Sequence, residues 1–314
     1  MDWTEKPIDV LSTGEILIDM IGQQMNHPLA ETHNFQRFLG GSPANVAFNL
    51  NALKLDVRFI GCIGRDGFGE FVLKKFQSNN LSIDGLKQID NAPTSIIMVS
   101  KTSETPEFIP YRGADFQIPD NQFTEDTLKK TKVFHTTCFA LSKNPAQQSI
   151  LNAAKLAKGF GAELSIDLNY SSKIWPDKAN ANSVIAEYLQ LDPLLKISED
   201  DIQRLLGKEL SHEEIFNYFQ NKFNLNRIYL TLGSQGVKYL NENKNIIHFP
   251  AQPIEEVKDA TGAGDAFWSG FLYGFTKGFR QDKCLKLGLN LASIKLQHVG
   301  GLPEDLKEFY DIAH

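Results

Sequence analysis

A glycine-rich turn followed by a carboxylate, DATGAGD, runs from Asp259 to Asp265. Apolar residues then recur every four positions, at Ala263, Phe267 and Phe271, which predicts a helix that begins near the glycines. The first turn of a helix has backbone N–H groups without partners and the positive end of the helix dipole. Glycines let an anion approach this backbone closely because they have no Cβ. The segment therefore predicts an anion site with a carboxylate beside it.

Asp265 is the candidate catalytic base of this site. It falls in the first turn of the predicted helix, where its carboxylate can accept the proton of an attacking hydroxyl group. The amides of Ala263 and Gly264 would then stabilise negative charge on a transferred phosphoryl group. The alternative is that Asp265 only caps the helix and that Gly270 and Gly274 allow close helix packing. The turn alone leaves both interpretations open, because short motifs often occur by chance.

The rest of the chain predicts an α/β architecture that positions this turn. From about residue 120 onward, short apolar segments alternate with helical patterns, which is typical of a parallel sheet flanked by helices. The predicted strands are 58–64, 132–139, 162–169, 195–198 and 227–232. The predicted helices are 45–55, 67–77 and 145–159. The segments 16–24, 35–41 and 94–112 have the pattern of antiparallel hairpins, which predicts either a small β lid over a ligand or an extension of the main sheet.

Composition limits the classes of protein that this chain can be. With 314 residues, of which 42% are hydrophobic, it can bury one large core or at most two smaller ones. A net charge of −6 argues against a nucleic-acid-binding protein. No apolar segment is long enough to span a bilayer, and the polar N-terminus lacks the pattern of a secretory signal. Three widely separated cysteines favour reduced thiols, and we expect a cytoplasmic protein.

Two known nucleotide-binding motifs are missing. The sequence contains no G-x-x-x-x-G-K-[ST] loop, which argues against a P-loop kinase or ATPase. No G-x-G-x-x-G follows the first predicted strand, which argues against a dinucleotide-dependent oxidoreductase.

The glycine turn, together with GGSPAN at 40–45, resembles the two signatures of the ribokinase (PfkB) family of sugar kinases. GEILID at 14–19 resembles the first strand of that family, and TLGSQG at 231–236 resembles its nucleotide-side loop. The resemblance extends over nearly the whole chain. It implies a single domain over 1–314 with a ribokinase-like three-layer α/β/α sandwich, a mostly parallel sheet and a small β-sheet lid. Inserted segments at about 16–38 and 94–115 would form the lid.

The resemblance also implies the roles of individual residues. Asp265 would be the base, with the anion hole formed by Gly262, Ala263 and Gly264. The sugar would be held by Asp19, Gly41, Asn45, Tyr111, Arg112 and Asn169. ATP would lie against Ser198, Thr231, Gly233, Gly236 and Asn290. Magnesium would be held through water by Asp201, and a potassium ion would lie near Asp259 and Thr261.

Two departures from the family pattern affect the site. The stretch Ser198-Glu-Asp-Asp201 stands where many members have N-x-x-E near magnesium. Ser171 stands where many have an arginine that contacts phosphate or sugar, and Lys173 could replace it only as a point charge.

Fructokinases are the most similar members, so we expect fructose and ATP as the small-molecule partners. A homodimer through the lid is also implied. The alternatives are a kinase of a sugar acid (2-keto-3-deoxygluconate or 5-dehydro-2-deoxygluconate), of ribose or of a nucleoside. A non-catalytic sugar- or nucleotide-binding regulator is an alternative of another class.

Overall fold

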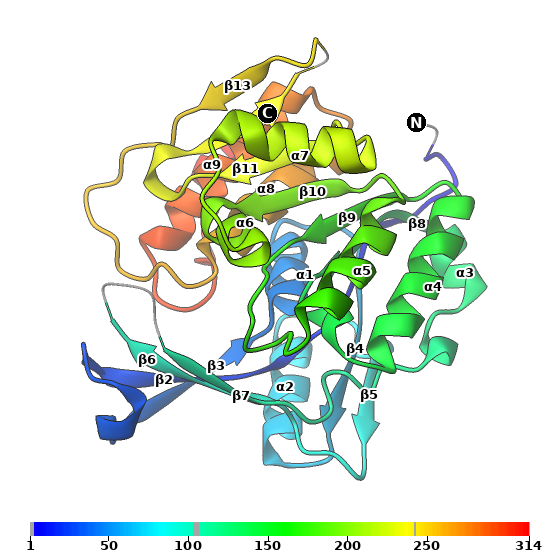
Figure 1. The fold of residues 1–314 in the computed structure, drawn as a ribbon. Coiled ribbons are helices and arrows are strands. Elements are labelled where there is room, and N and C mark those ends of the chain that lie inside the picture. The colour runs from blue at the N-terminus through cyan, green and yellow to red at the C-terminus, as the bar shows by residue number, and fades with distance from the viewer. Residues whose placement is uncertain (1–2, 103–106, 242, 314) are drawn as a thin grey trace.

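The computed structural model describes residues 3–102, 107–241 and 243–313, so 103–106 of the predicted lid segment lie outside the described residues. The strands form two separate sheets (Figure 1). The large sheet has nine strands in the order β13-β12-β11-β10-β9-β8-β1-β4-β5, and the small sheet has four in the order β3-β2-β6-β7. The segments predicted as antiparallel hairpins, 16–24, 35–41 and 94–112, thus contribute to a sheet of their own and do not extend the main one.

The large sheet is parallel except at one edge, where β11–β12 and β12–β13 are antiparallel. Its strands are β1 Ile8–Thr13, β4 Val57–Gly64, β5 Leu86–Ile89, β8 Thr131–Thr137, β9 Glu163–Asp167, β10 Leu194–Ser198, β11 Ile228–Thr231, β12 Val237–Leu240 and β13 Ile246–Phe249. All five predicted strands are present. The sequence interpretation missed β1 and placed the first strand at 14–19, because β1 carries the polar residues Asp9, Ser12 and Thr13. All three are buried, and Asp9 pairs with Lys132 of β8.

Helices cover both faces of the large sheet and complete three layers (Figure 1). They are α1 Ser42–Ala52, α2 Gly67–Ser78, α3 Glu125–Lys129, α4 Ala146–Gly159, α5 Lys178–Leu189, α6 Glu199–Leu206, α7 His212–Phe223, α8 Ala263–Thr276, α9 Gln281–Leu296 and α10 Lys307–Ala313. One hydrophobic core lies under α3 to α7, and a second lies under α1, α2, α8, α9 and α10. No helix in the described part of the chain is both long enough and apolar enough to cross a membrane.

Helices α8 and α9 pack closely through glycine. A Cβ on Gly270 would lie 2.5 Å from the carbonyl oxygen of Leu287, and one on Gly274 would lie 3.0 Å from Sγ of Cys284. Real Cβ atoms do not approach a backbone oxygen as closely as 2.5 Å, so Gly270 requires glycine or a shift of the helices, whereas at Gly274 the neighbouring side chain would have to move by a few tenths of an ångström. The packing interpretation of these two glycines is therefore correct, and it leaves the role of Asp265 open.

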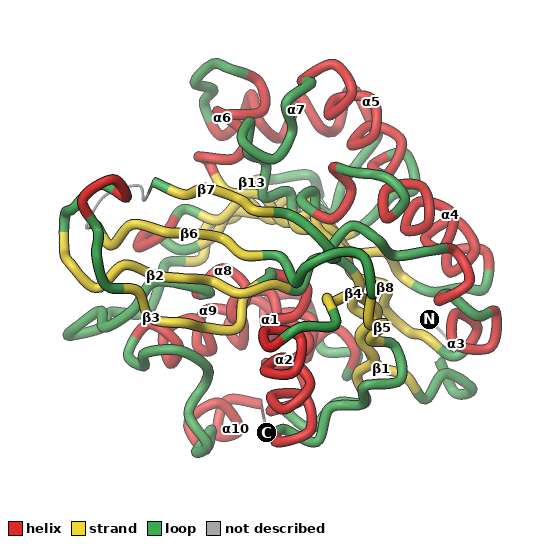
Figure 2. Tube along the Cα trace, turned by 90° about the horizontal axis from the view of Figure 1, so that it is seen from below, coloured by secondary structure: helices red, strands yellow, loops and turns green. Residues whose placement is uncertain are grey.

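The small sheet brings one sugar-binding candidate to the start of α1. It contains β2 Leu17–Met25, β3 Phe35–Gly40, β6 Ile96–Lys101 and β7 Phe108–Tyr111, and Figure 2 shows it as a layer apart from the large sheet. In the β2–β3 pair, Asp19 lies opposite Phe38 and Leu17 lies opposite Gly40. Since a single residue, Gly41, separates β3 from α1, the chain carries Asp19 and the N-terminus of α1 to the same place.

Candidate active site

Both oxygens of the Asp265 carboxylate are oriented by side chains of α1. Ser42 Oγ donates a hydrogen bond to Oδ1 over 2.6 Å, and Asn45 Nδ2 donates one to Oδ2 over 2.8 Å. Each carboxylate oxygen has a second lone pair, so Asp265 can still accept a proton from a substrate. The N-cap residue of α8 is Gly262, in a left-handed conformation with φ 75°, and the helix has no side-chain cap. Asp265 is therefore not the cap of α8, and its side chain points to α1.

Two carboxylates lie within electrostatic reach of each other at this place. Burial raises the pKa of Asp265 to about 6, and the charge of Asp167 adds to the shift, whereas Ser42, Lys196 and Asn45 oppose it. Burial and the charge of Asp265 raise the pKa of Asp19 to about 7. These shifted values are typical of functional sites, because carboxylates there are desolvated and placed near like charges.

These pKa values predict the acid side of the pH profile. A general base acts as the carboxylate, so activity is lost as pH falls through its pKa in the folded protein. We expect kcat/KM to decrease as the pH falls from about 7 to about 6, because these are the raised pKa values of Asp19 and Asp265. Initial rates from pH 5 to pH 9 at saturating ATP test this. A flat profile down to about pH 5 would show that activity does not depend on a carboxylate whose pKa is raised above its usual range.

A buried ammonium group adjoins the beginning of α8. Lys196 Nζ lies 2.6 Å from Asp167 Oδ2, and the two side chains are 7% and 4% exposed. A Cβ on Gly264 would lie 3.2 Å from the same Nζ, so the cation is next to the first turn of the helix. The amides of that turn and Lys196 together form a positive region in which an anion can bind.

Sequence reasoning missed Ser42, Asp167 and Lys196. Lys196 lies directly opposite Asp167 in the β9–β10 register, so only the pairing of the strands shows that the two charges meet. The available signal was a lysine within the apolar strand LKIS, since a charged residue in a buried strand needs a partner.

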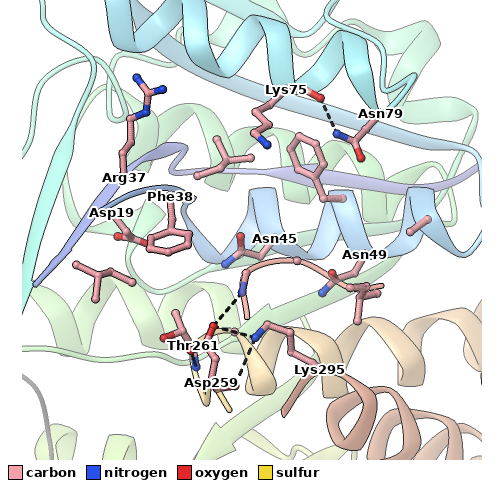
Figure 3. Close-up of a pocket in the computed structure, with 18 of the residues that line it drawn as sticks. Asp19, Arg37, Phe38, Asn45, Asn49, Lys75, Asn79, Asp259, Thr261 and Lys295 are labelled. Atoms are coloured by element: carbon pink, nitrogen blue, oxygen red, sulfur yellow. Dashed lines mark hydrogen bonds and ion pairs between the residues drawn. The ribbon is translucent and has the colours of Figure 1, made fainter. Parts of the chain in front are cut away.

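A pocket of about 480 Å³ lies beside this centre, and five predicted residues line it: Asp19, Asn45, Asp259, Thr261 and Gly262. They come from β2, α1 and the turn before α8, which are far apart in the sequence. Figure 3 shows Asp19 next to Phe38 on one side of the pocket, and Asp259 with Lys295 at the other. Arg37 of β3 and Lys75 of α2 also line it, and neither was predicted. The structure therefore brings two of the six sugar-binding candidates, Asp19 and Asn45, and both potassium candidates together around one cavity.

The lid candidates are placed differently. Tyr111 of β7 is 59% exposed. Arg112 Nη2 pairs with Asp115 Oδ2 at 2.6 Å, and its guanidinium group also donates to Ser142. Asn169 Oδ1 accepts a hydrogen bond from the amide of Phe139. None of the three lies among the residues that line the pocket, so their contact with a sugar stays a prediction.

Lys173 does not replace the missing arginine in this structure. Its Nζ donates to the carbonyl oxygen of Phe108 over 2.9 Å and lies 4.7 Å from the centre of the Phe108 ring. The lysine therefore contacts the small sheet, at strand β7.

The predicted nucleotide residues lie at the carboxyl ends of neighbouring strands. Ser198 and Thr231 are paired at the ends of β10 and β11. Gly233 begins the short 3-10 turn Gly233–Gln235 that follows β11, and Gly236 comes directly after this turn. The two glycines have φ values of 55° and 96°. Ligands of α/β proteins commonly bind outside the carboxyl ends of parallel strands.

Asn290 differs from this group. It is fully buried on α9, where Nδ2 donates to Glu308 Oε1 over 3.0 Å. A contact with adenine would require this part of α9 to become accessible.

Asp201 is held within its own helix. Ser198 Oγ donates to Asp201 Oδ2 over 2.5 Å, and Arg204 Nη1 donates to Oδ1 over 3.2 Å. Among the described residues, no group of three or more His, Cys, Asp or Glu side chains is arranged to hold a metal ion. Magnesium commonly binds one or two carboxylates and takes its other ligands from water and substrate phosphates.

A helix start with a buried carboxylate and an ammonium group, in a three-layer α/β sandwich with a second small sheet, is an arrangement suited to phosphoryl transfer. The chain belongs to the pfkB family of carbohydrate kinases, because residues 8–306 match the family model described as "pfkB family carbohydrate kinase". It is thus an ATP-dependent carbohydrate kinase with a ribokinase-like fold, as the sequence predicted. Family membership favours the enzyme over the non-catalytic regulator.

Individual proteins similar to this chain have related activities. The ATP-dependent 6-phosphofructokinase of Thermoanaerobacterium thermosaccharolyticum is 33% identical over 98% of this chain and 95% of its own length. The fructokinase structure from Halothermothrix orenii is 33% identical, with a TM-score of 0.78, over 89% of this chain and 98% of that chain. The structure of an uncharacterized sugar kinase from Pyrococcus horikoshii in complex with ATP is 26% identical, with a TM-score of 0.83, over 96% and 99% of the two chains.

Proposed function

We propose that this kinase transfers the γ-phosphoryl group of ATP to a primary hydroxyl group of fructose, with Asp265 as the base. The observation that carries the proposal is the carboxylate of Asp265, which Ser42 and Asn45 orient at the first turn of α8. The similarity to the fructokinase of Halothermothrix orenii supports fructose as the sugar.

In the proposed reaction the hydroxyl oxygen of the sugar attacks the γ-phosphorus of ATP. A new O–P bond forms, the bond from the γ-phosphorus to the bridging oxygen breaks, and ADP leaves. Asp265 accepts the hydroxyl proton. The amides at the beginning of α8 and the ammonium group of Lys196 stabilise the charge on the transferred group. Magnesium, with Asp201 as the candidate carboxylate, would neutralise charge on the ATP phosphates.

The charges around the site favour a neutral sugar over a sugar acid. Asp19 and Asp265 can accept hydrogen bonds from sugar hydroxyl groups, and carboxylates repel another carboxylate. Arg112 is bound to Asp115 and Ser142, and Lys173 is bound to the backbone of β7. Neither of these two cations is therefore presented to the carboxylate of a sugar acid, which would have to reach the cations that line the pocket, Arg37, Lys75 and Lys295.

A second candidate substrate is fructose 6-phosphate. The relative from Thermoanaerobacterium thermosaccharolyticum is a 6-phosphofructokinase, and three cationic side chains line the pocket of this chain, Arg37, Lys75 and Lys295. Arg37 Cζ lies 3.9 Å from the centre of the Phe71 ring, and Lys75 Nζ lies 5.7 Å from it. A phosphate group at the far end of the sugar would find both charges at this side of the pocket.

A substrate panel tests the proposal. ADP formation is measured with fructose, fructose 6-phosphate, 2-keto-3-deoxygluconate, 5-dehydro-2-deoxygluconate, ribose and adenosine, each with MgATP. We expect the highest kcat/KM with fructose. A higher value with fructose 6-phosphate, reduced in the Arg37→Ala variant, would replace fructose with the second candidate. A higher value with a sugar acid, ribose or adenosine would overturn both.

Asp19→Ala should raise the KM for the sugar. The variant loses hydrogen bonds from hydroxyl groups to a carboxylate, each worth about 1.5–3 kcal/mol, and each 1.4 kcal/mol changes affinity about tenfold. We therefore expect KM to rise about tenfold to hundredfold, while the KM for ATP stays the same. Steady-state kinetics with each substrate varied in turn measure both values. A rise in the KM for ATP alone would mean that the two pockets are assigned the wrong way round.

We further propose a homodimer formed through the small sheet. Exposed apolar side chains on this sheet support it: Met25 is 52% exposed, Ile109 39% and Tyr111 59%. Such residues on one sheet are typical of a surface that another chain covers. Sedimentation equilibrium should give twice the chain mass, and Tyr111→Glu should shift the protein to a single chain. We also propose a cytoplasmic location, which cell fractionation tests.

A further inference from the structure

The ammonium group of Lys295 is enclosed by three oxygen atoms. Lys295 lies in the last turn of α9, and its side chain is 5% exposed. Its Nζ lies 3.2 Å from Asp259 Oδ2, 3.4 Å from the carbonyl oxygen of Asp259 and 3.1 Å from that of His298. An ammonium group has three N–H donors and no acceptor. Three oxygens therefore match its three donors.

The site is built for one positive charge. Asp259 Oδ1 accepts a hydrogen bond from the amide of Thr261 over 2.9 Å, and Oδ2 accepts one from Gly300 over 3.1 Å. Burial alone would raise the pKa of Asp259, but these amides and the charge of Lys295 together lower it. Asp259 is thus an anion at neutral pH. The negative end of the α9 dipole lies next to it and also favours a cation.

The side chain of Lys295 lies next to Gly262, at the beginning of the predicted anion site. A Cβ on Gly262 would be 3.9 Å from Lys295 Cε and 3.9 Å from Asp265 Oδ2. The amides of Lys258 and Asp259 donate to the carbonyl oxygen of Leu296, over 2.8 Å and 3.3 Å, so the end of α9 holds the chain that leads into the turn. The contacts of Lys295 therefore connect α9 with the backbone before the first turn of α8.

The resemblance to the family implied a potassium ion near Asp259 and Thr261, and these residues do not fit it. The oxygens that would coordinate the ion already surround an ammonium group of the same charge, and two cations there would repel each other. We propose that Lys295 is a tethered monovalent cation that replaces potassium and positions the turn at Gly262. Lys295 is a positioning residue, because its ammonium group is held by oxygens of Asp259 and His298 and acts through the turn.

The first test compares salts with the wild-type enzyme. Turnover of the best sugar in the panel is measured in tetramethylammonium chloride and in potassium chloride at equal ionic strength. We expect the same kcat in both salts. A kcat that requires potassium in the wild-type enzyme would overturn the proposal.

The second test removes the ammonium group and asks whether potassium restores its effect. In tetramethylammonium chloride, Lys295→Met should lower kcat about tenfold to hundredfold, the usual cost of a misplaced catalytic backbone. Potassium or ammonium ions should then restore most of the activity, since the oxygens remain and lack only a charge. Lys286→Met is the matched control, because Lys286 is an exposed lysine of the same helix, and it should respond to neither salt.

Thermal unfolding gives a readout that does not depend on the sugar. The Tm of Lys295→Met should rise with potassium concentration because the ion binds the folded state, whereas the Tm of the wild type and of Lys286→Met should not. Absence of any potassium response in folded Lys295→Met, in either kcat or Tm, would refute the proposal, as would full turnover of this variant in tetramethylammonium chloride. If Lys295→Met does not fold in any salt, the same kcat and Tm measurements on Lys295→Gln, together with the comparison of the two salts for the wild-type enzyme, test the proposal. Failure of fructose as the substrate leaves the Tm result unaffected.

Discussion

Asp265→Asn is expected to lower kcat by about 10²–10⁴-fold, the usual contribution of a general base. An amide has nearly the shape of a carboxylate but cannot accept the hydroxyl proton, so the sugar oxygen stays protonated during attack. The substitution keeps the side chain between Ser42 and Asn45, so we expect small changes in the KM for both substrates. Single-turnover measurements of phosphoryl transfer test this directly, because they separate the chemical step from product release.

Ser42→Ala is the control for this prediction. It removes one hydrogen bond to Asp265 but leaves the base, so kcat should fall much less than in Asp265→Asn. Circular dichroism and Tm should show that both variants are folded. Near-normal turnover in folded Asp265→Asn would remove Asp265 from the role of base.

Lys196→Met is expected to be the most destabilising of the substitutions discussed. Lys196 Nζ and Asp167 Oδ2 form an ion pair of 2.6 Å with almost no solvent contact, and Asp167 Oδ1 has no hydrogen-bond partner in the described structure. Removing the ammonium group leaves a buried carboxylate without its partner, which costs about 3–5 kcal/mol in the free energy of unfolding. Urea denaturation measures this loss, and kcat should fall as well because the positive charge beside Gly264 is gone.

The double variant Lys196→Met with Asp167→Asn separates the two roles of the lysine. It removes both charges, and neutral replacement of a buried ion pair often costs little, so stability should return to near the wild-type value. If Lys196 stabilises the transferred phosphoryl group, kcat stays low in the double variant. Recovery of kcat along with stability would show that Lys196 only neutralises Asp167. An exposed pair, Lys155 and Glu187, is the control, since Lys155→Met should change stability by about 1 kcal/mol or less.

Several features were predictable because they depend on residues close together in the sequence. The glycine turn and Asp265 are neighbours in the chain, and the apolar repeat that follows them marks the beginning of α8. The alternation of apolar strands with helical patterns predicted the parallel sheet, since each strand and each helix has its own periodicity. The resemblance of the two signatures extended this to the family and to the ATP-dependent reaction.

Other features depend on contacts between distant segments, which no local pattern specifies. The register of β9 and β10 sets Lys196 opposite Asp167, and the packing of α1 against α8 brings Ser42 to Asp265. The same kind of contact places Arg112 against Asp115 and Ser142, whereas the resemblance implied that Arg112 helps to hold the sugar.

The sequence by itself determined where the anion-binding turn begins, which carboxylate follows it and which class of fold carries them, because these properties follow from short-range backbone geometry and from apolar periodicity. Only the tertiary structure decided which charges surround that turn. A charge acts on whatever the fold brings within a few ångströms, whatever the separation in sequence. The ammonium group of Lys295 against Asp259 is the clearest case, since the resemblance implied a potassium ion near Asp259 and only the fold shows that the end of α9 places an ammonium group there.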